Sequence, residues 1–516
     1  MKSSASYKSK SKRYRRGRKR RIVAVLAAVF LLLLVGLAVR PRGHAATVPA
    51  AAAAHPQRAS TVAAVSHSPA PAWGQASRAE LRSALHEALS PALSVAGTCS
   101  CVVIAQDGTL LYDDGGSKAV TPASAQKLIA ADAALAQLGP QYRFDTLLAA
   151  SQPPKDGTVE GNVWLEGSGD PSLRSDDLRA GVAQLRKQGI RAVQGSVAVD
   201  GSALAGEEIN PLWNAGDANE DFMAATSGIS VDEDTVEFHV TGTSPGEAAH
   251  VSIKPRSSDV HYYGSVETGG GNYVVIAATE TPNEFRLDGN IPPGIEETYY
   301  LPVHGIDRYA GSVMTALLKE GGIAVSSPPQ TGTVPLDALI LWEHRSKPLT
   351  ELLKHMLVVS DNHFAEQLMR TVGGRRSGDT ADDHDGLSAE RAVLAQQSIP
   401  TPGLRIVDGS GLAHANRVAA ITLARILAYY DEQPGGNVLY PLLPRGGKDG
   451  TLKMYQFTSA QGRVRAKSGH VDGVSSLVGY VDTRKHGRVV FAFLINGSAG
   501  DPDSAIVSAV DRLAER

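Results

Sequence analysis

Three short motifs occur in one order along this chain of 516 residues, and their spacing limits the folds that can bring them together. They are Ser124-Ala-Gln-Lys127, Ser360-Asp-Asn362 and Lys467-Ser-Gly469. Each is weak alone, since a serine three residues before a lysine also occurs at Ser9 and Lys12 in a basic tail. Together they supply the hydroxyl, amine and amide groups of lysine-activated serine chemistry. About 230 residues separate the first motif from the second, so the fold must bring distant segments together.

The first motif has the local context of a helix start. Thr121-Pro122 precedes it, and the Ala- and Leu-rich residues 127–138 continue the helix until Gly139-Pro140. Ser124 and Lys127 then lie one turn apart on the same face, so the amine can reach the hydroxyl. Burial or a second cation would favour the neutral amine, which can act as a base. Taken alone, such a motif is more often a serine and a lysine exposed to solvent.

The second motif follows an apolar helical run within residues 349–372. Its simplest interpretation is a turn or a helix cap. The functional interpretation gives Ser360 the relay of a proton to a leaving nitrogen. Asn362 then hydrogen-bonds the substrate backbone and Lys127.

The third motif precedes the alternating run 474–481. The simpler interpretation is that Lys467 opens an edge strand, where a lysine commonly protects the edge from aggregation. The functional interpretation uses Lys467 and Ser468 to hold a substrate carboxylate. Gly469 would allow that substrate to approach the backbone closely.

The charge of the chain is unevenly distributed. Residues 1–79 contain 15 Lys and Arg but no acid, which leaves 36 basic residues against all 53 acidic ones in the remainder. A basic cluster in residues 1–21 leads into the uncharged run 22–39, which predicts a membrane signal-anchor, with a cleaved signal peptide as the alternative. In either case we expect the body to be exported to the extracytoplasmic side. The acidic body argues against a nucleic-acid partner.

Changes in residue composition and in the pattern of apolar residues along the chain predict its domains. Residues 40–77 are rich in Ala, Pro and Ser and are typical of a linker. Short alternating runs separated by Gly, Pro and Asp fill residues 150–300 and predict a β-rich insertion. Residues 78–149 and 301–516 have mixed helical and strand patterns. The expected fold class is therefore α/β or α+β, with one catalytic domain split by the insertion.

Two further groups of residues contain side chains of the types that bind metals. Asp382-Asp-His-Asp385 could suggest a metal, but consecutive ligands on one loop rarely close a coordination sphere. Cys99 and Cys101 are the only cysteines; two thiols cannot form a zinc site, and we expect them to be small buried side chains. The sequence therefore implies no metal or organic cofactor.

With these motifs the chain resembles the D-alanyl-D-alanine carboxypeptidase/endopeptidases of the S13 peptidase type, the low-molecular-mass class C penicillin-binding proteins. The resemblance covers residues 78–516. It extends to further strings, which are Gly169-Asp-Pro-Ser-Leu173, Ser360-Asp-Asn-His-Phe-Ala-Glu366, Asp408-Gly-Ser-Gly-Leu412, Gly450-Thr-Leu452 and Gly473-Val-Ser-Ser-Leu477. It implies a serine DD-peptidase that cleaves peptidoglycan stem peptides through an acyl-enzyme and that binds β-lactams.

The resemblance also implies roles for single residues. Ser124 is the expected nucleophile, Lys127 its base, Ser360 and Asn362 the second motif, and Lys467, Ser468 and Gly469 the third. The backbone N–H groups of Ser124 and His470 form the expected oxyanion hole. Asp217 matches an aspartate that receives the cationic end of the stem peptide, and an exposed loop acid is the equally weighted alternative.

The chain departs from the family pattern in three places. Ser468 stands where threonine is usual, His470 where a small hydroxyl residue is common, and Ala215 where an aromatic is often found. One alternative function remains, a catalytically silent wall-binding or β-lactam-sensing protein. A β-lactamase or esterase is disfavoured by the large insertion.

Overall fold

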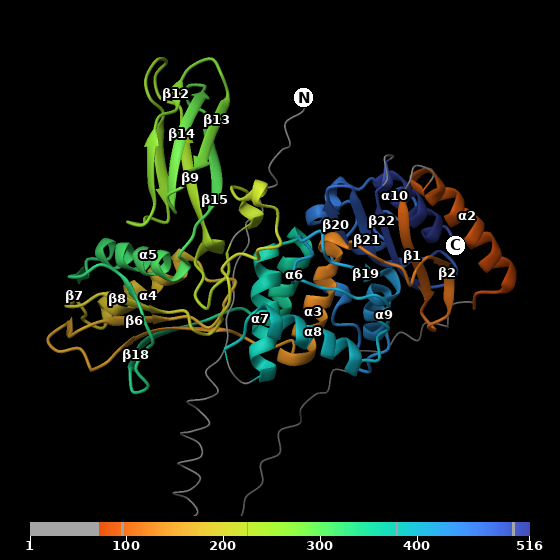
Figure 1. Cartoon of the computed structure of the whole chain (residues 1–516), viewed down its shortest axis with the longest axis horizontal. Helices are drawn as coiled ribbons and strands as arrows, with labels where there is room; N and C mark the ends of the chain where they lie inside the picture. Colours follow the sequence, from red (N-terminus) through yellow and green to blue (C-terminus); the bar gives the residue numbers. More distant parts are fainter. Residues whose placement is uncertain (1–71, 94–96, 224, 378–379, 498–500) are drawn as a thin grey trace, which may run out of the picture.

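The structure, a computed structural model, describes residues 72–93, 97–223, 225–377, 380–497 and 501–516. The predicted basic tail, the apolar run 22–39 and nearly all of the linker lie outside these ranges. None of the helices within them is long and apolar enough to cross a membrane. The described chain forms two lobes, with a bundle of helices between them (Figure 1).

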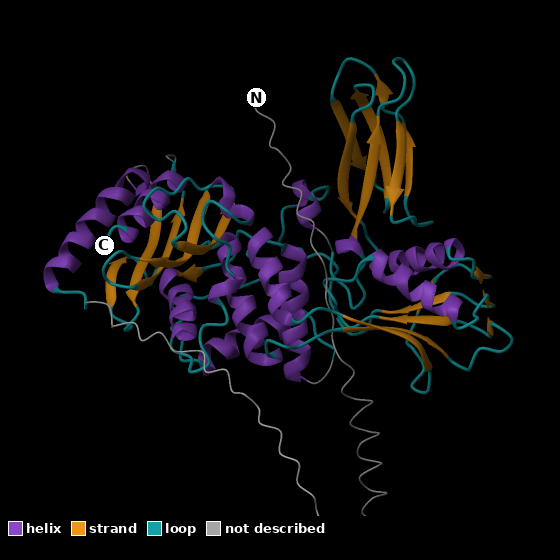
Figure 2. Cartoon of the chain, turned by 180° about the vertical axis from the view of Figure 1, so that it is seen from behind, coloured by secondary structure: helices purple, strands orange, loops and turns teal. Residues whose placement is uncertain are grey.

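The C-terminal lobe is built on an antiparallel five-stranded sheet. Its strands, in spatial order, are β2 (Leu110–Asp114), β1 (Thr98–Ala105), β22 (Arg488–Asn496), β21 (Val474–Asp482) and β20 (Val464–Val471). Alternate side chains of β1 enter different cores, because Val102 and Ile104 face one side and Cys101 and Val103 the other. Helices α2 (Gln75–Leu93) and α10 (Pro502–Ala514) cover one face, and α9 (Ala420–Asp431) covers the opposite one (Figure 2).

A helical layer fills the centre of the molecule. Its members are α3 (Lys127–Leu138), α6 (Leu349–Val359), α7 (Asn362–Ser377) and α8 (Asp383–Gln396), with the short helices η1 (Ala123–Gln126), η5 (Tyr440–Leu442) and η6 (Gly450–Met454) and the strand pair β3 (Ala119–Val120) and β19 (Val418–Ala419) beside it. Helix α3 begins and ends where the sequence predicts. Most of it is buried, since its many alanines let α7, α8 and α9 approach closely.

The helix predicted over residues 349–372 is divided in two. Ser360 ends α6 in the left-handed conformation, with φ of 63°, and α7 begins two residues later at Asn362. A non-glycine residue in this region is uncommon and often marks a functional turn. The break turns the second motif into a sharp corner between two helices.

The inserted lobe contains a mixed sheet covered by helices α4 (Ser175–Lys187) and α5 (Ile306–Glu320). Its strands are β17 (Gln330–Thr331), β8 (Val197–Asp200), β6 (Val163–Glu166), β4 (Asp145–Ala150) and β18 (Leu339–Arg345), next to a small parallel sheet of β16 (Ala324–Val325), β7 (Ala192–Val193) and β5 (Thr158–Val159). Strands β4 and β18 pair with each other, so the inserted unit extends beyond residues 150 and 300 on both sides.

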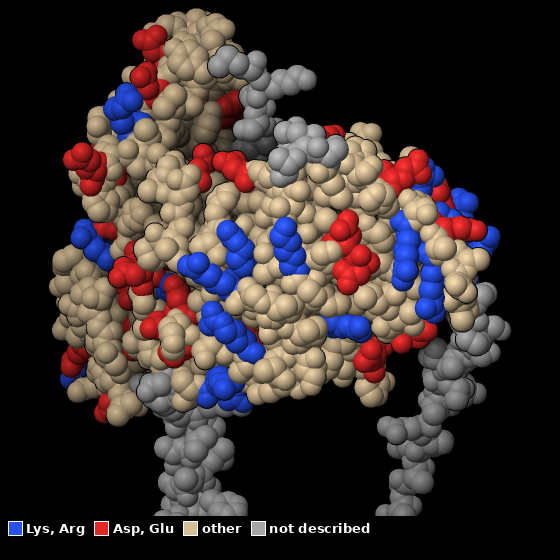
Figure 3. Space-filling model, turned by 45° about the vertical axis from the view of Figure 1, so that its right-hand side comes forward, with Lys and Arg blue, Asp and Glu red and all other residues tan. Residues whose placement is uncertain are grey.

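A separate β-module projects from this lobe, at the upper left of Figure 1. It consists of β9 (Thr235–Thr241), β10 (His250–Lys254) and β15 (Glu296–Pro302) in one sheet, and β11 (His261–Gly264), β12 (Glu267–Thr268), β13 (Tyr273–Ala278) and β14 (Glu284–Ile291) in the other. A loop with the short helices η2 (Ala215–Asp217), η3 (Asp221–Met223) and η4 (Asp232–Asp234) precedes the module and contacts α7. On the face shown in Figure 3, acidic and basic side chains are interspersed.

Candidate active site

Lys127 is the centre of the site, and its amine joins three segments of the chain. Its Nζ lies 3.0 Å from Ser124 Oγ, on the preceding short helix. It donates to Asn362 Oδ1 at 2.7 Å and to the carbonyl oxygen of Ser410 at 2.9 Å. The structure therefore brings together the first and second motifs, which the sequence separates by about 230 residues.

The environment of Lys127 favours its neutral form. Burial lowers the pKa of this amine to about 8, although the negative charges of Glu366, Asp408 and Asp361 act in the opposite direction. Desolvation disfavours the charged form of any amine, so the burial of α3 has a direct chemical consequence.

Lys467 joins the third motif to the second. Its Nζ donates to Ser360 Oγ at 2.8 Å and to the carbonyl oxygen of Ser468 at 2.5 Å. Burial, together with the charge of Lys127, holds the pKa of Lys467 well below its usual value. Lys467 does not open a strand but lies within β20, the edge strand of the sheet.

Gly469 is required by a close approach between β20 and the helix that carries Ser124. A Cβ at this position would lie 2.5 Å from Ser476 Oγ, 2.7 Å from the backbone nitrogen of Ser124 and 2.8 Å from that of Ala125. The hydroxyl of Ser476 donates to the carbonyl oxygen of Pro122 at 2.8 Å, which fixes the strand against the helix start. The edge strand β20 and the turn that carries Ser124 therefore lie directly against each other.

A loop behind Lys127 is held by two buried carboxylates. Glu366 accepts from the backbone nitrogens of Gly409 and Ser410, at 3.0 and 2.8 Å. Asp408 accepts from those of Gly411 and Ala413, at 2.8 and 2.7 Å. Burial, with the nearby charge of Asp408, raises the pKa of Glu366 to about 8.

This loop presents the carbonyl of Ser410 to Lys127. Asp408, Ser410 and Glu366 all belong to strings that the resemblance includes. Sequence reasoning nevertheless assigned them no role, because a carbonyl contact leaves no signature in residue type.

The inserted lobe contacts the site through the loop before its β-module. Asn362 Nδ2 donates to the carbonyl oxygen of Phe222 at 3.1 Å. Trp213 Nε1 donates to Asp408 Oδ2 at 3.0 Å. Asp217 lies in this loop, where it accepts from Asn214 Nδ2 at 3.1 Å and remains partly exposed. The structure therefore places Asp217 on a loop that is tied to the site, without bringing its carboxylate into the Ser124–Lys127 cluster.

His470 has a partner at the end of β20. Its Nε2 donates to Asp503 Oδ1 at 2.9 Å, and Ser475, opposite it on β21, donates to the same oxygen at 2.7 Å. Although burial alone would raise the pKa of Asp503, the hydrogen bonds and charge of these neighbours lower it. The imidazole is thus hydrogen-bonded to the first turn of α10.

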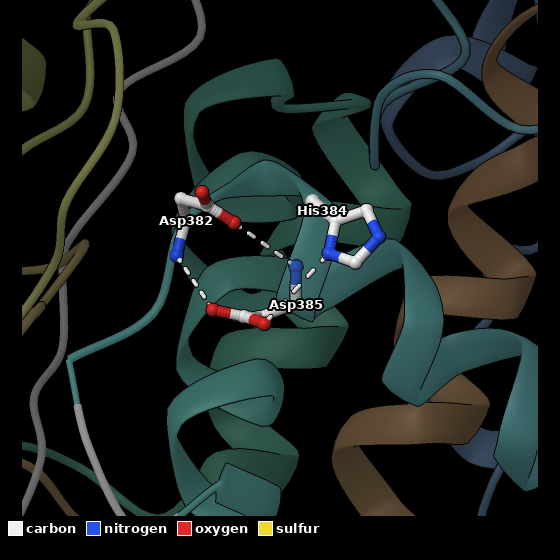
Figure 4. A group of neighbouring side chains, drawn as sticks. All are labelled: Asp382, His384 and Asp385. Carbon is white, nitrogen blue, oxygen red and sulfur yellow. Dashed lines mark hydrogen bonds and ion pairs between the residues drawn. The ribbon is translucent and has the colours of Figure 1, made fainter.

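The cluster of Asp382, His384 and Asp385 has a structural explanation (Figure 4). Asp382 accepts from the backbone nitrogen of Asp385 at 3.1 Å, and Asp385 accepts from that of Asp382 at 3.5 Å. This reciprocal pair caps the N-terminus of α8. The ring of His384 is 88% exposed, so the group lacks an enclosed coordination sphere.

Three features together define a penicillin-binding-type serine acyl-transferase on an α/β scaffold. They are the serine with its buried lysine, the turn that carries Ser360 and Asn362, and the edge strand that carries Lys467. The chain belongs to the D-Ala-D-Ala carboxypeptidase 3 (S13) family, which it matches over residues 79–516. This confirms the resemblance found in the sequence, and with it the class of serine-type D-Ala-D-Ala carboxypeptidases.

Several known proteins are similar over most of their length. A D-alanyl-D-alanine carboxypeptidase of Actinomadura sp. is 32% identical over 470 residues, which cover 86% of this chain and 87% of that protein. The D-alanyl-D-alanine carboxypeptidase DacB of Haemophilus influenzae is 27% identical over 77% of this chain and 84% of its own length. The crystal structure of penicillin binding protein 4 from Haemophilus influenzae superposes with a TM-score of 0.73, at 26% identity, over 84% of this chain and 98% of that one. The predicted fold class is thereby confirmed.

Proposed function

We propose that this protein is a serine DD-peptidase in which Ser124 attacks the carbonyl of the penultimate D-alanine of a stem peptide, or of a D-centre cross-link. The attack forms an ester between Ser124 and the acyl group and releases the amine of the leaving residue. Water then hydrolyses the ester and returns the free serine. The contact between Ser124 Oγ and Lys127 Nζ is the observation that carries this proposal.

The hydrogen bonds of Lys127 favour its role as the base. A neutral amine has two N–H groups and one lone pair. Asn362 Oδ1 and the Ser410 carbonyl oxygen only accept, so they take both N–H groups. The lone pair is then left for the proton of the Ser124 hydroxyl. The same two contacts would steady the ammonium after proton transfer.

Roles for the other groups follow from their contacts. Ser360 Oγ accepts a hydrogen bond from Lys467 Nζ, and its hydroxyl can pass a proton to the leaving nitrogen. Ser468 and Lys467 would bind the substrate carboxylate. The backbone N–H groups of Ser124 and His470 would stabilise the oxyanion, where one donor is typically worth about 10²–10³ in rate. Asp217 would receive the cationic end of the stem peptide.

β-Lactams would acylate the same serine. The penicillin binding protein 4 of Haemophilus influenzae has also been crystallised in complex with a β-lactam. The basic residues 1–21 and the apolar run 22–39 support an exported enzyme held at the outer face of the membrane by a signal-anchor. Its substrate there would be the stem peptides of peptidoglycan.

Labelling of the full chain with a fluorescent penicillin tests the nucleophile. We expect labelling of the wild type and of Ser9→Ala, which has the same Ser–Lys spacing in the basic tail, but none of Ser124→Ala. Persistent labelling of Ser124→Ala would refute the assignment. Defined muropeptides analysed by mass then test the reaction, since a protein that is labelled but releases no D-alanine and opens no cross-link would be a silent β-lactam sensor.

A further inference from the structure

A second hydroxyl lies beside the serine of the third motif. Thr451 Oγ1 is 2.7 Å from Ser468 Oγ. Ser468 is only 2% exposed, whereas Thr451 is partly exposed. The two residues come from different elements, β20 and η6, so tertiary packing alone creates the pair.

The backbone around Thr451 is fixed from two sides. Gly450 has φ of 46°, and a Cβ there would lie 1.7 Å from the carbonyl oxygen of Val358, near the end of α6. Leu452 is fully buried, and its carbonyl accepts from the backbone nitrogen of Gly447 at 2.9 Å. The start of η6 is thus pressed against the helix that ends at Ser360. The position of the Thr451 hydroxyl is therefore set by the same packing that sets the second motif.

The neighbouring position on β20 contributes no hydroxyl. His470 lies two residues after Ser468 on this strand, and its ring nitrogen is hydrogen-bonded to Asp503 at 2.9 Å. Within the described part of the chain, Thr451 supplies the hydroxyl that is hydrogen-bonded to Ser468.

A count of protons shows what this hydroxyl can do. Each hydroxyl has one proton to donate and two lone pairs. If Thr451 donates to Ser468 Oγ, the single proton of Ser468 is free for a carboxylate. If Ser468 donates to Thr451 instead, it has no proton left for the substrate. A bound anion favours the first arrangement, because a hydrogen bond to a charged acceptor is stronger than one between neutral groups.

We propose that Thr451 is a positioning residue for the terminal carboxylate of the substrate. Its hydroxyl donates to Ser468 Oγ and thereby directs the Ser468 hydroxyl proton at that carboxylate. The inference rests on the proposed function and deepens it. It makes Thr451 a determinant of specificity for substrates with a free carboxyl terminus, in place of the hydroxyl absent at position 470.

Thr451→Val removes the hydroxyl and keeps the shape, and Thr451→Ser restores it. The full chain is assayed on an acyl-D-alanyl-D-alanine peptide and on the matching acyl-D-alanyl benzyl thioester, whose leaving group has no carboxylate. We expect Thr451→Val to raise KM about three- to tenfold for the peptide and less than twofold for the thioester. Thr451→Ser should restore the peptide KM. Equal changes on both substrates, or no change on either, would overturn the inference.

A double-mutant cycle with Ser468→Ala tests whether Thr451 acts through Ser468. Once Ser468→Ala has removed that hydroxyl, Thr451→Val should add no further rise in the peptide KM. Additive effects would show that Thr451 acts by another route and would overturn the inference. A wild type that hydrolysed neither substrate would instead refute the proposed function, so the two failures are distinguishable.

Discussion

Trp213 Nε1 donates to the buried carboxylate of Asp408 at 3.0 Å, and this bond joins the inserted lobe to the loop behind Lys127. Asp408 also accepts from backbone nitrogens of its own loop, whose Ser410 carbonyl contacts Lys127. The bond therefore couples the loop that carries Asp217 to the hydrogen-bond network of the base.

Replacement of Trp213 by Phe should weaken this coupling. We expect a loss of about 1–2 kcal/mol in the free energy of unfolding, since the carboxylate loses a donor, and a higher KM for stem peptides. Trp164→Phe is the matched control, because the Trp164 indole nitrogen is buried without a hydrogen-bond partner among the described residues. Denaturant unfolding and peptide kinetics check both variants. Equal responses would contradict a role for the Trp213 bond.

Gly469→Ala should slow acylation strongly without unfolding the protein. The added methyl would overlap Ser476 Oγ and the backbone nitrogen of Ser124, so strand and nucleophile must separate. We expect the acylation rate to fall about 10²-fold or more, as for loss of an oxyanion donor. Gly435→Ala, which meets no atom within 4 Å, serves as the control. Stopped-flow acylation by a fluorescent penicillin measures the effect, and near-normal acylation of Gly469→Ala would contradict it.

The rate of acylation should rise with pH through about 8. The pKa of Lys127 is lowered to about 8 by burial, so the ammonium predominates below that pH and the reactive amine above it. A plot of the acylation rate constant from pH 6 to 10 should therefore show one ascending limb near pH 8. A flat profile across this range would argue against Lys127 as the base.

Asn362→Asp should move that limb to higher pH. A carboxylate 2.7 Å from Lys127 Nζ favours the ammonium, which raises the pKa of the lysine by about one unit or more. The acylation rate at neutral pH should fall about tenfold, with partial recovery at alkaline pH. Loss of activity that does not recover at any pH would show that Asn362 acts otherwise than through the charge on Lys127.

The burial of Glu390 should make the free energy of unfolding depend on pH. Its carboxyl lies on α8 and is fully buried, and neither oxygen has a hydrogen bond within the described part of the chain. Burial raises its pKa well above 4.5. The unfolded chain therefore releases this proton first, so wild-type stability falls as pH rises above 4.5. Glu390→Gln removes this titration. Its stability relative to the wild type should increase from pH 5 to pH 9 in urea unfolding, and a difference that stays constant over this range would contradict the prediction.

The helices and strands near the site were largely predictable from local patterns. Helix α3 begins at Lys127 and ends at Leu138, as its Ala-rich pattern and the following Gly-Pro predict. The division at Ser360 was not predictable, because the apolar spacing continues across it and the left-handed residue is a serine. The edges of the insertion were also hidden, because β4 and β18 pair across about 190 residues of intervening chain.

The reactive groups of this protein can be identified from its residues alone, since the three motifs, their order and their spacing identify the family. How those groups interact depends on the folded arrangement. It buries Lys127 and so lowers its pKa, turns the Ser410 carbonyl toward it, and sets Thr451 beside Ser468. Burial and hydrogen-bond geometry depend on what packs around a residue, and the residues responsible come from segments far apart in the chain.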